Sequence, residues 1–233
     1  MTRIVLLRHA HSVANAKGIL AGRLSNVPLS ERGLIQAEKL KEQLQEINFS
    51  AIYLSPMERC AQTISPFVES LSSVQRKKIR IEVDPDLNEV DYGKWSGKKL
   101  ALLSRDKLWK VVQNHPSSMY FPEGEGLLQM QARAVRALNS AAHSKGTGPK
   151  LLVSHGDVIK AIIANIVGTH LDHFQNIVID PASISILDFN GEDFRLLTMN
   201  NTTSTVSELV NLHSKSGKSL KALLGGGSGG TKR

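Results

Sequence analysis

The sequence predicts an α/β fold in which a mostly parallel central sheet lies between two layers of helices. Three short apolar runs rich in branched side chains, at residues 4–7, 51–54 and 150–153, are typical of buried strands. Segments with apolar residues at helical spacing follow these runs along the chain. Strands that alternate with helices favour a parallel sheet covered on both faces, which gives a three-layer α/β/α arrangement.

Further strands are expected where alternating runs end at turn residues. Residues 78–83 alternate between apolar and charged side chains, which is typical of a strand. Two late runs are separated by Asn190-Gly191, a strong signal for an antiparallel hairpin. The expected strands are 4–7, 51–54, 78–83, 150–153, 184–189 and 194–199.

Helices are expected where apolar residues recur at intervals of three and four. Ser30 is a typical N-cap, and Gly168 closes the last of these segments. Pro56 suits the start of another helix, which would hold Arg59 in its first turn. The expected helices run from Ser30 to residue 47 and over 57–71, 98–113, 124–144 and 158–167, with a loop over 84–97.

Length and composition favour a single globular domain with a tail. A chain of 233 residues with 41% hydrophobic side chains can bury one good-sized core without a second domain. Residues 1–212 are therefore assigned to one α/β domain. Residues 213–233 are rich in Lys, Ser and Gly, which is typical of a flexible basic tail.

The net charge of +8 invites a nucleic-acid interpretation, but its position argues against one. Five cations and no acid follow Glu208, which leaves +3 for the rest of the chain. The tail also lacks the interleaved aromatic residues that stack on bases. A modest positive field around an anionic small-molecule site is the preferred interpretation, with no nucleic acid as the main partner.

Cysteine content and apolar runs bear on the compartment. Cys60 is the only cysteine, so an intrachain disulfide is impossible and a reducing compartment is compatible. No apolar run approaches the length of a membrane span, and the first is too short for a signal peptide. We expect a cytoplasmic protein without a membrane partner; an oligomer is left open.

Imidazole side chains follow directly after two of the expected strands. Arg8-His9 ends the first strand, and His155 follows the strand at 150–153. Open α/β sheets bind ligands at the carboxyl ends of their strands, so both histidines can face one pocket.

Phosphoryl transfer needs the residue types that this chain supplies. A phosphomonoester dianion must be neutralised, which the guanidinium groups of Arg8 and Arg59 can do. A neutral imidazole, such as His9 or His155, can attack phosphorus. The leaving alkoxide then needs a proton, and Glu89 is a candidate acid.

Six motifs in order connect these residues over roughly residues 3–168. They are Arg8-His9-Ala10 with Asn15; Gly22, Arg23, Pro28, Leu29, Gly33, Gln36 and Ala37; Ser55-Pro56-Met57-Glu58-Arg59-Cys60-Ala61-Gln62-Thr63; Leu87-Asn88-Glu89 with Gly93, Trp95 and Gly97; Pro122-Glu123-Gly124-Glu125; and Ser154-His155-Gly156. In this order the chain resembles the histidine phosphatase superfamily, in the branch that contains phosphoglycerate mutases and related phosphatases.

The resemblance implies a phosphoglycerate mutase-like fold and a role for each site residue. His9 would become phosphorylated, Arg8, Arg59 and His155 would bind phosphoryl oxygens, and Glu89 would donate the proton. No metal or other cofactor is implied. The residues expected to contact phosphate or substrate are Ser12, Asn15, Gly22 and Gly156.

Two residues depart from the family pattern. Ala10 replaces a glycine, and its methyl group would cause strain if its φ angle were positive. His11 stands where the family often has a longer polar residue, so it could alter specificity. Together with His9 and Asp157, His11 also leaves a metallophosphoesterase as an alternative.

A metal-independent phosphatase acting on a small phosphorylated metabolite is the predicted function. Glu89 and His155 are 66 positions apart, a short insertion compared with the long cap of the glycolytic mutases. A smaller cap leaves a more open site, which favours attack by water. A phosphomutase is the second interpretation. A weak module that only binds phosphorylated ligands is the third, kept open by Ala10.

Overall fold

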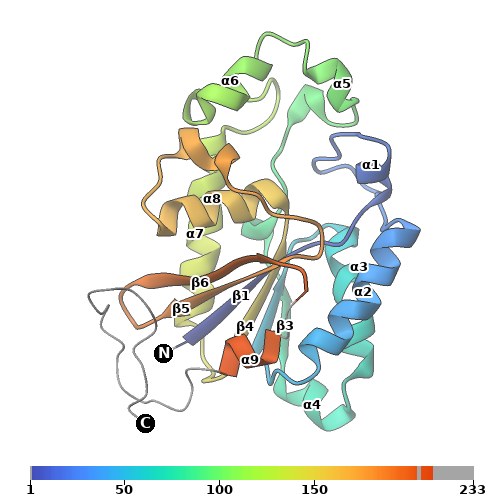
Figure 1. Cartoon of the computed structure of the whole chain (residues 1–233), viewed down its shortest axis with the longest axis vertical. Coiled ribbons are helices and arrows are strands. Elements are labelled where there is room, and N and C mark those ends of the chain that lie inside the picture. Colours follow the sequence, from blue (N-terminus) through green and yellow to red (C-terminus); the bar gives the residue numbers. More distant parts are fainter. Residues whose placement is uncertain (1, 204–205, 212–233) are drawn as a thin grey trace.

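The computed structural model describes residues 2–203 and 206–211, which form one six-stranded sheet with helices on both faces (Figure 1). The strand order is β3-β2-β4-β1-β5-β6. The first four strands in the chain run parallel, whereas β5 is antiparallel to β1 and to β6. The predicted α/β/α fold with a mostly parallel sheet is confirmed. The strands are β1 (Thr2–Arg8), β2 (Ala51–Leu54), β3 (Arg80–Val83), β4 (Lys150–Ser154), β5 (Ile184–Phe189) and β6 (Phe194–Asn201).

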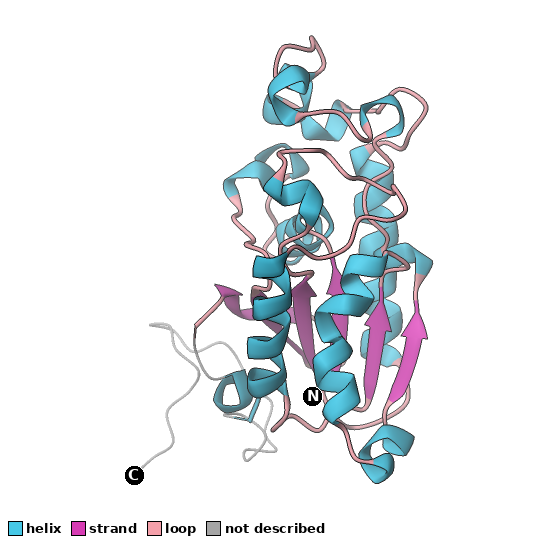
Figure 2. Ribbon diagram, turned by 90° about the vertical axis from the view of Figure 1, so that its right-hand side faces the viewer, coloured by secondary structure: helices cyan, strands magenta, loops and turns pink. Residues whose placement is uncertain are grey.

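The two faces of the sheet bury different side chains, because successive residues of a strand point to opposite faces. In β1, Ile4 and Leu6 belong to one apolar cluster, and Val5 and Leu7 belong to the other. Figure 2 shows helices on either side of the strands. The first cluster is covered by α7 (Leu127–His143) and α8 (Gly156–Ile166), and the second by α2 (Glu31–Leu44), α3 (Glu58–Ser70) and α9 (Val206–Asn211).

Strand register brings the two histidines together. Arg8 at the end of β1 lies opposite Ser154 at the end of β4. The next residue along each strand is a histidine, and the His9 amide donates to the Ser154 carbonyl at 2.9 Å. On the other side of β4, the Ser55 amide donates to the Val153 carbonyl, also at 2.9 Å. Three adjacent strands therefore deliver polar side chains to one edge of the sheet.

A small cap stands beyond this edge, at the top of Figure 1, and corrects the prediction of one helix over 98–113. The segment contains two short helices, α5 (Leu100–Leu103) and α6 (Trp109–Asn114). Between them the Ser104 hydroxyl donates to the Ala101 carbonyl, and an Asp106 carboxylate oxygen accepts from the Leu108 amide. Such local side-chain bonds compete with a continuous helix.

Other predicted elements differ mainly at their ends. The strand expected at 78–83 begins at Arg80, because Ser72 and Gln75 form a capping box that starts α4 (Ser73–Lys78). The helix expected at 158–167 begins at Gly156, directly after the second histidine. The sequence did not predict α1, α4, α9 or the short 3₁₀ turns. These additional elements are α1 (Val13–Ala16), η1 (Pro85–Leu87), η2 (Gly93–Trp95), η3 (Pro116–Ser118) and η4 (Leu171–Asn176).

Two predictions concern segments that the structure does not test. The basic tail over 213–233 lies outside the described residues, and the boundary of the domain at 212 stays a prediction. Within the part of the chain that is described, no helix combines the length and the apolar character needed to cross a bilayer.

Candidate active site

A cavity of about 400 Å³ opens at the carboxyl ends of β1 and β4. Its lining combines residues that are far apart in the sequence, because the end of β1, the start of α3, the loop after η1 and the start of α8 all meet there. The predicted site residues in this lining are Arg8, His9, Ser12, Asn15, Gly22, Arg59, Glu89 and Gly156. His155 lies directly behind it, with its ring 5.1 Å from the ring of His9, measured between centroids.

The surroundings of His9 fix which ring nitrogen carries the proton. Nδ1 lies 2.7 Å from the Ala10 carbonyl oxygen, which can only accept, so Nδ1 is protonated and donates. Nε2 therefore has a free lone pair, and it accepts a hydrogen bond from Arg59 Nε at 3.3 Å. Burial, together with Arg59 and Arg8, holds the pKa of His9 well below its usual range. A neutral imidazole whose Nε2 carries no proton is the form that can act as a nucleophile.

Arg59 connects three parts of the site from the first turn of α3. Its side chain is buried, and its guanidinium faces His9 on one side. Nη2 donates to the Gly22 carbonyl at 2.9 Å and to His155 Nδ1 at 3.1 Å. The planar guanidinium is thereby oriented by the protein before any anion binds, which favours bidentate contact with phosphate oxygens.

Arg8, the last residue of β1, supplies a second guanidinium group to the cavity. Its Nη1 donates to the Ile179 carbonyl, whereas the buried Nε has no hydrogen-bond acceptor among the described residues. A buried donor of this kind is satisfied when an anion oxygen approaches it. Gly156 lets this side chain lie close, since a Cβ atom at that position would be 3.2 Å from Arg8 Cζ.

The start of α8 adds to the positive potential of the cavity. His155 is the N-cap of this 11-residue helix, and Gly156 and Asp157 in its first turn line the cavity. Free backbone N–H groups at a helix N-terminus attract anions. Two arginines and this helix start are together suited to hold a phosphoryl group.

His155 is held in the tautomer opposite to that of His9. Its Nδ1 accepts from Arg59, so Nε2 carries the proton and donates to Ser55 Oγ at 2.7 Å. Burial, followed by the charge of Arg59, lowers the pKa of His155 well below its usual range. Ser55 belongs to a motif that the sequence singled out, but its contact with the second histidine was not foreseen.

Glu89 has the protonation behaviour of a general acid. Burial and, to a smaller extent, the charge of Asp157 raise its pKa from 4.5 to about 7, against the opposing charge of Arg59. Its Oε2 lies 3.5 Å from His155 Nδ1, on the cavity side of the second histidine. Near neutral pH this carboxyl group is therefore available both as an acid and, once deprotonated, as a base.

A buried ion network that the sequence did not reveal holds the backbone of Glu89. Arg133 in α7 donates from Nη1 to the Asn88 carbonyl at 2.6 Å and from Nη2 to the Glu89 carbonyl at 3.0 Å. Arg23 donates from Nε to the same Glu89 carbonyl at 2.9 Å. Both arginines also bind Glu125, at 2.7 and 2.9 Å. Glu125, which the sequence singled out only as part of a motif, thus fastens the loop that carries the acid.

Two further contacts shape the inner wall. The Tyr92 hydroxyl donates to Asp157 Oδ2 at 2.8 Å, and Tyr92 lines the cavity. Trp95, which belongs to the same motif as Glu89, packs in the core, where it stacks on Trp109. Ser12 and Asn15 cap α1 with each other, since the Ser12 amide and hydroxyl both donate to Asn15 Oδ1.

The two departures from the family pattern have local explanations. Ala10 is not among the residues with positive φ, so the strain considered for its methyl group does not arise. Its amide donates to Thr63 Oγ1 at 2.9 Å. His11 lies outside the cavity lining, with Nδ1 2.9 Å from Ser30 Oγ, so the specificity role considered for it finds no support. In the described part of the chain, His9, His11 and Asp157 do not converge as a metal-ligand group.

The comparisons with known sequences agree on one family. The family model of the histidine phosphatase superfamily (branch 1) matches residues 4–202. Phosphoserine phosphatase 1 of Hydrogenobacter thermophilus is 26% identical over 219 residues, which cover 91% of this chain and 99% of that protein. The 2,3-bisphosphoglycerate-dependent phosphoglycerate mutase of Thermoplasma acidophilum is 27% identical over 215 residues, which cover 89% and 98%.

The solved structures give the same result at the level of the fold. YhfR of Bacillus stearothermophilus is similar with a TM-score of 0.80 and 25% identity, covering 88% of this chain and all of that one. The α-ribazole phosphatase of Shigella flexneri shares the fold with a TM-score of 0.75 at 24% identity, over 86% of this chain and 97% of that one. The family model covers most of the sequence and includes every motif that suggested the resemblance. The chain belongs to the histidine phosphatase superfamily, branch 1.

Proposed function

We propose that the protein hydrolyses phosphomonoesters through a phosphohistidine formed on His9. The observation that carries this proposal is the lone pair of His9 Nε2, which faces Arg59 in a cavity that Arg8 also lines. A nucleophile placed among two fixed guanidinium groups can meet a phosphate dianion without the repulsion that opposes the reaction in water.

The reaction proceeds in two transfers that return every group to its starting state. His9 Nε2 forms a bond to phosphorus while the bond to the alcohol oxygen breaks, and the Glu89 carboxyl proton passes to that oxygen. A water molecule then attacks the phosphohistidine and gives its proton to the Glu89 carboxylate. The N–P bond breaks, which releases inorganic phosphate and neutral His9. Arg8 and Arg59 bind the phosphoryl oxygens in both steps, and His155, whose Nε2 proton is donated to Ser55, orients Arg59 through Nδ1.

Hydrolysis is preferred over transfer to a second hydroxyl group. The insertion between Glu89 and His155 is short, and its two cap helices have only four and six residues. A cap of this size leaves the cavity open to water, which then competes with any second alcohol for the phosphohistidine. Relatives with both kinds of name are similar to this chain, so a phosphomutase is the second candidate. The substrate in either case is a small phosphorylated metabolite, and a cytoplasmic location stays a prediction.

Turnover of p-nitrophenyl phosphate with and without EDTA tests the proposal. Hydrolysis at an unchanged rate in EDTA is the expected result, because the proposed steps use only side chains. A second assay supplies 3-phosphoglycerate with a catalytic amount of 2,3-bisphosphoglycerate and monitors formation of the 2-isomer. Isomerisation faster than release of inorganic phosphate would establish the mutase instead. Loss of all turnover in EDTA would contradict the proposed mechanism.

A further inference from the structure

Beyond the phosphate-binding residues, one wall of the cavity is formed by aliphatic side chains. Leu20 follows α1, Leu100 comes from α5, and Ile177 and Val178 follow η4. These segments converge from three distant parts of the chain. The chain segments of this wall also contact the arginines, since Arg8 donates to the Ile179 carbonyl and Arg59 to the Gly22 carbonyl. The wall is therefore placed to face the alcohol portion of a bound phosphomonoester.

We propose that the substrate is the phosphomonoester of an uncharged, largely apolar alcohol, and that esters carrying a carboxylate are discriminated against. This inference rests on the proposed phosphatase function and specifies its substrate class. Burial of aliphatic groups against aliphatic wall residues stabilises the complex.

The charged side chains in the outer part of the cavity disfavour a substrate that carries a carboxylate in addition to its phosphate. Beyond Arg8 and Arg59, Lys160 is the one cationic side chain in the lining formed by the described residues. Its Nζ lies 3.5 Å from Asp157 Oδ1 and donates to Gln175 Oε1 at 3.1 Å. Asp180 adds a second carboxylate to the same lining. A substrate carboxylate would therefore meet two carboxylates and one ammonium group that is already paired.

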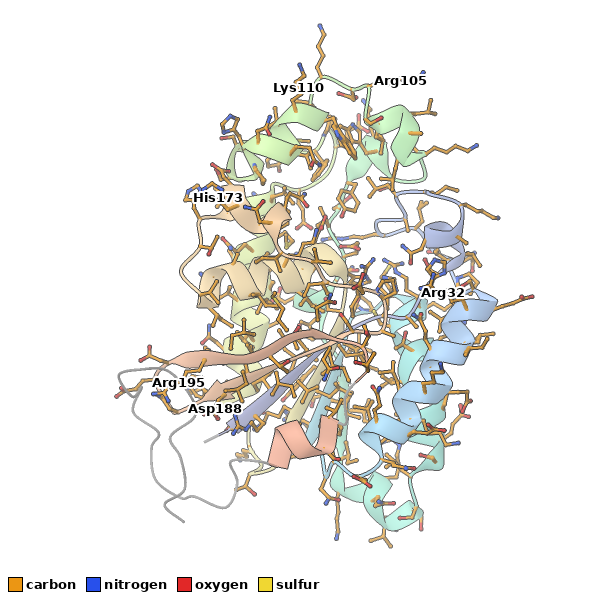
Figure 3. All side chains as sticks on the ribbon, in the orientation of Figure 1. Arg32, Arg105, Lys110, His173, Asp188 and Arg195 are labelled. Atoms are coloured by element: carbon orange, nitrogen blue, oxygen red, sulfur yellow. The ribbon has the colours of Figure 1, made fainter. Side chains whose placement is uncertain are left out.

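The basic residues of the cap do not change this balance. Figure 3 places Arg105 and Lys110 on the outermost part of the cap, away from the sheet. Lys98 and Lys99 directly precede α5 and are exposed. None of these four basic residues belongs to the cavity lining. These cations can attract an anionic substrate to the protein, but they do not contact a carboxylate inside the cavity.

The substrate classes implied by two relatives' names differ from this one. Phosphoserine and phosphoglycerate each carry a carboxylate in addition to the phosphate. An enzyme for such substrates needs a cation free to bind the carboxylate, because a desolvated carboxylate is costly when it is unpaired. The lining that the described residues form offers aliphatic groups and no unpaired cation outside the phosphate-binding residues.

A pair of isosteric esters provides the test. In 4-methylpentyl phosphate two methyl groups occupy the places of the two carboxylate oxygens of 4-phosphooxybutanoate, so size and leaving oxygen are matched. We expect kcat/KM for the alkyl ester to exceed that for the carboxylate ester by at least about 15-fold, the value of burying two additional methyl groups. Equal values, or a preference for the carboxylate ester, would overturn the inference while leaving the phosphatase function intact. Turnover of neither ester would contradict both.

Two lysine variants with matched exposure locate the effect. Val178 lines the cavity and Leu102 lies on α5 outside it, and each is 59% exposed, so both substitutions are compatible with folding. Val178→Lys places an ammonium group on the cavity wall, where it can pair with the carboxylate of 4-phosphooxybutanoate. The ratio of kcat/KM for the alkyl ester to kcat/KM for the carboxylate ester should therefore fall by at least about tenfold. Leu102→Lys should leave the ratio of the two kcat/KM values unchanged. An equal shift in both variants would show that overall charge, and not the wall, sets the preference.

Discussion

Ala10 and Glu89 show how single residues combine packing with chemistry in this site. The Ala10 side chain is fully buried and packs with Leu29 and Ala37. The backbone carbonyl oxygen of Ala10 accepts a hydrogen bond from His9 Nδ1. Glu89 carries a charge only above about neutral pH, because burial opposes ionisation. The sequence predicted both as residues of interest from motif positions alone. It could not predict the φ angle of Ala10 or the pKa of Glu89, because both depend on neighbours that folding supplies.

The Ala10 methyl group contributes to stability without obstructing the reaction. Ala10→Gly removes one buried methyl group and adds backbone freedom to the unfolded chain, so the free energy of unfolding should fall by about 1–2 kcal/mol. The value of kcat/KM for p-nitrophenyl phosphate should remain within about twofold of the wild type, because the contact between Nδ1 and the backbone carbonyl is kept. An increase above tenfold would show instead that the methyl group hinders substrate.

Glu89→Gln separates proton donation from binding. The variant keeps the shape of the side chain but cannot transfer a proton, so kcat for an alkyl phosphate should fall by about 10²–10⁴-fold. The loss should be much smaller with p-nitrophenyl phosphate, whose leaving group needs no proton. Steady-state kinetics on the two substrates make the comparison, and equal losses on both would argue against the role of Glu89 as the acid.

The pH dependence of stability tests the protonation state of Glu89 independently of turnover. Its pKa is about 7 in the folded protein, above the ordinary 4.5, so the folded state holds this proton more tightly. The stability that results is complete below pH 4.5 and is lost as pH rises through 7. At pH 8 the free energy of unfolding of Glu89→Gln should therefore exceed that of the wild type by up to about 3 kcal/mol. At pH 4.5 the two proteins should have similar free energies of unfolding. Urea unfolding at both pH values measures this, and a difference that does not change with pH would refute it.

At the scale of secondary-structure elements, prediction succeeded where burial is continuous and failed where side chains bind the backbone locally. The strands β1, β2 and β4 each contain an uninterrupted buried apolar run, which gives a clear sequence signal. The cap was predicted as one helix because Asp106 and Ser104 form turns whose effect no periodicity reveals. The Arg133–Glu125 network was missed for a related reason. Its main acceptors are backbone carbonyls of a distant loop, which leave no trace in the sequence.

Helix α7 is linked to the acid-bearing loop through Arg133, and a second arginine on the same helix provides a control. Arg133→Met removes one of the two arginine partners of half-buried Glu125 and three carbonyl contacts, so it should cost about 3–5 kcal/mol of stability and lower kcat. Arg136, one turn along, forms a surface pair with Asp86 at 2.8 Å. Arg136→Met should cost less than about 1 kcal/mol and leave kcat unchanged. Equal effects in thermal unfolding and kinetics would contradict the role given to Arg133.

At the scale of the whole molecule, the strand order of the sheet explains why six separated motifs act as one site. The strands β1, β4 and β2 are neighbours, so their carboxyl ends place His9, His155 and Ser55 side by side. The order of motifs allowed the fold and the central residues to be predicted. The outer wall of the cavity was not predictable in this way, because Leu100 and Val178 come from segments that resemble no motif. They meet only in the folded chain, where α6 of the cap packs against η4.

The most direct test of the central claim is rapid-quench analysis of the enzyme during turnover of a phosphomonoester with radioactive phosphate. The account predicts a protein-bound label that is stable in alkali, labile in acid and mapped by peptide analysis to His9. The label should be absent from His9→Ala, whose unfolding should be checked to confirm that it folds. Label on another residue, or undiminished label in His9→Ala, would contradict the assignment of His9 as the nucleophile.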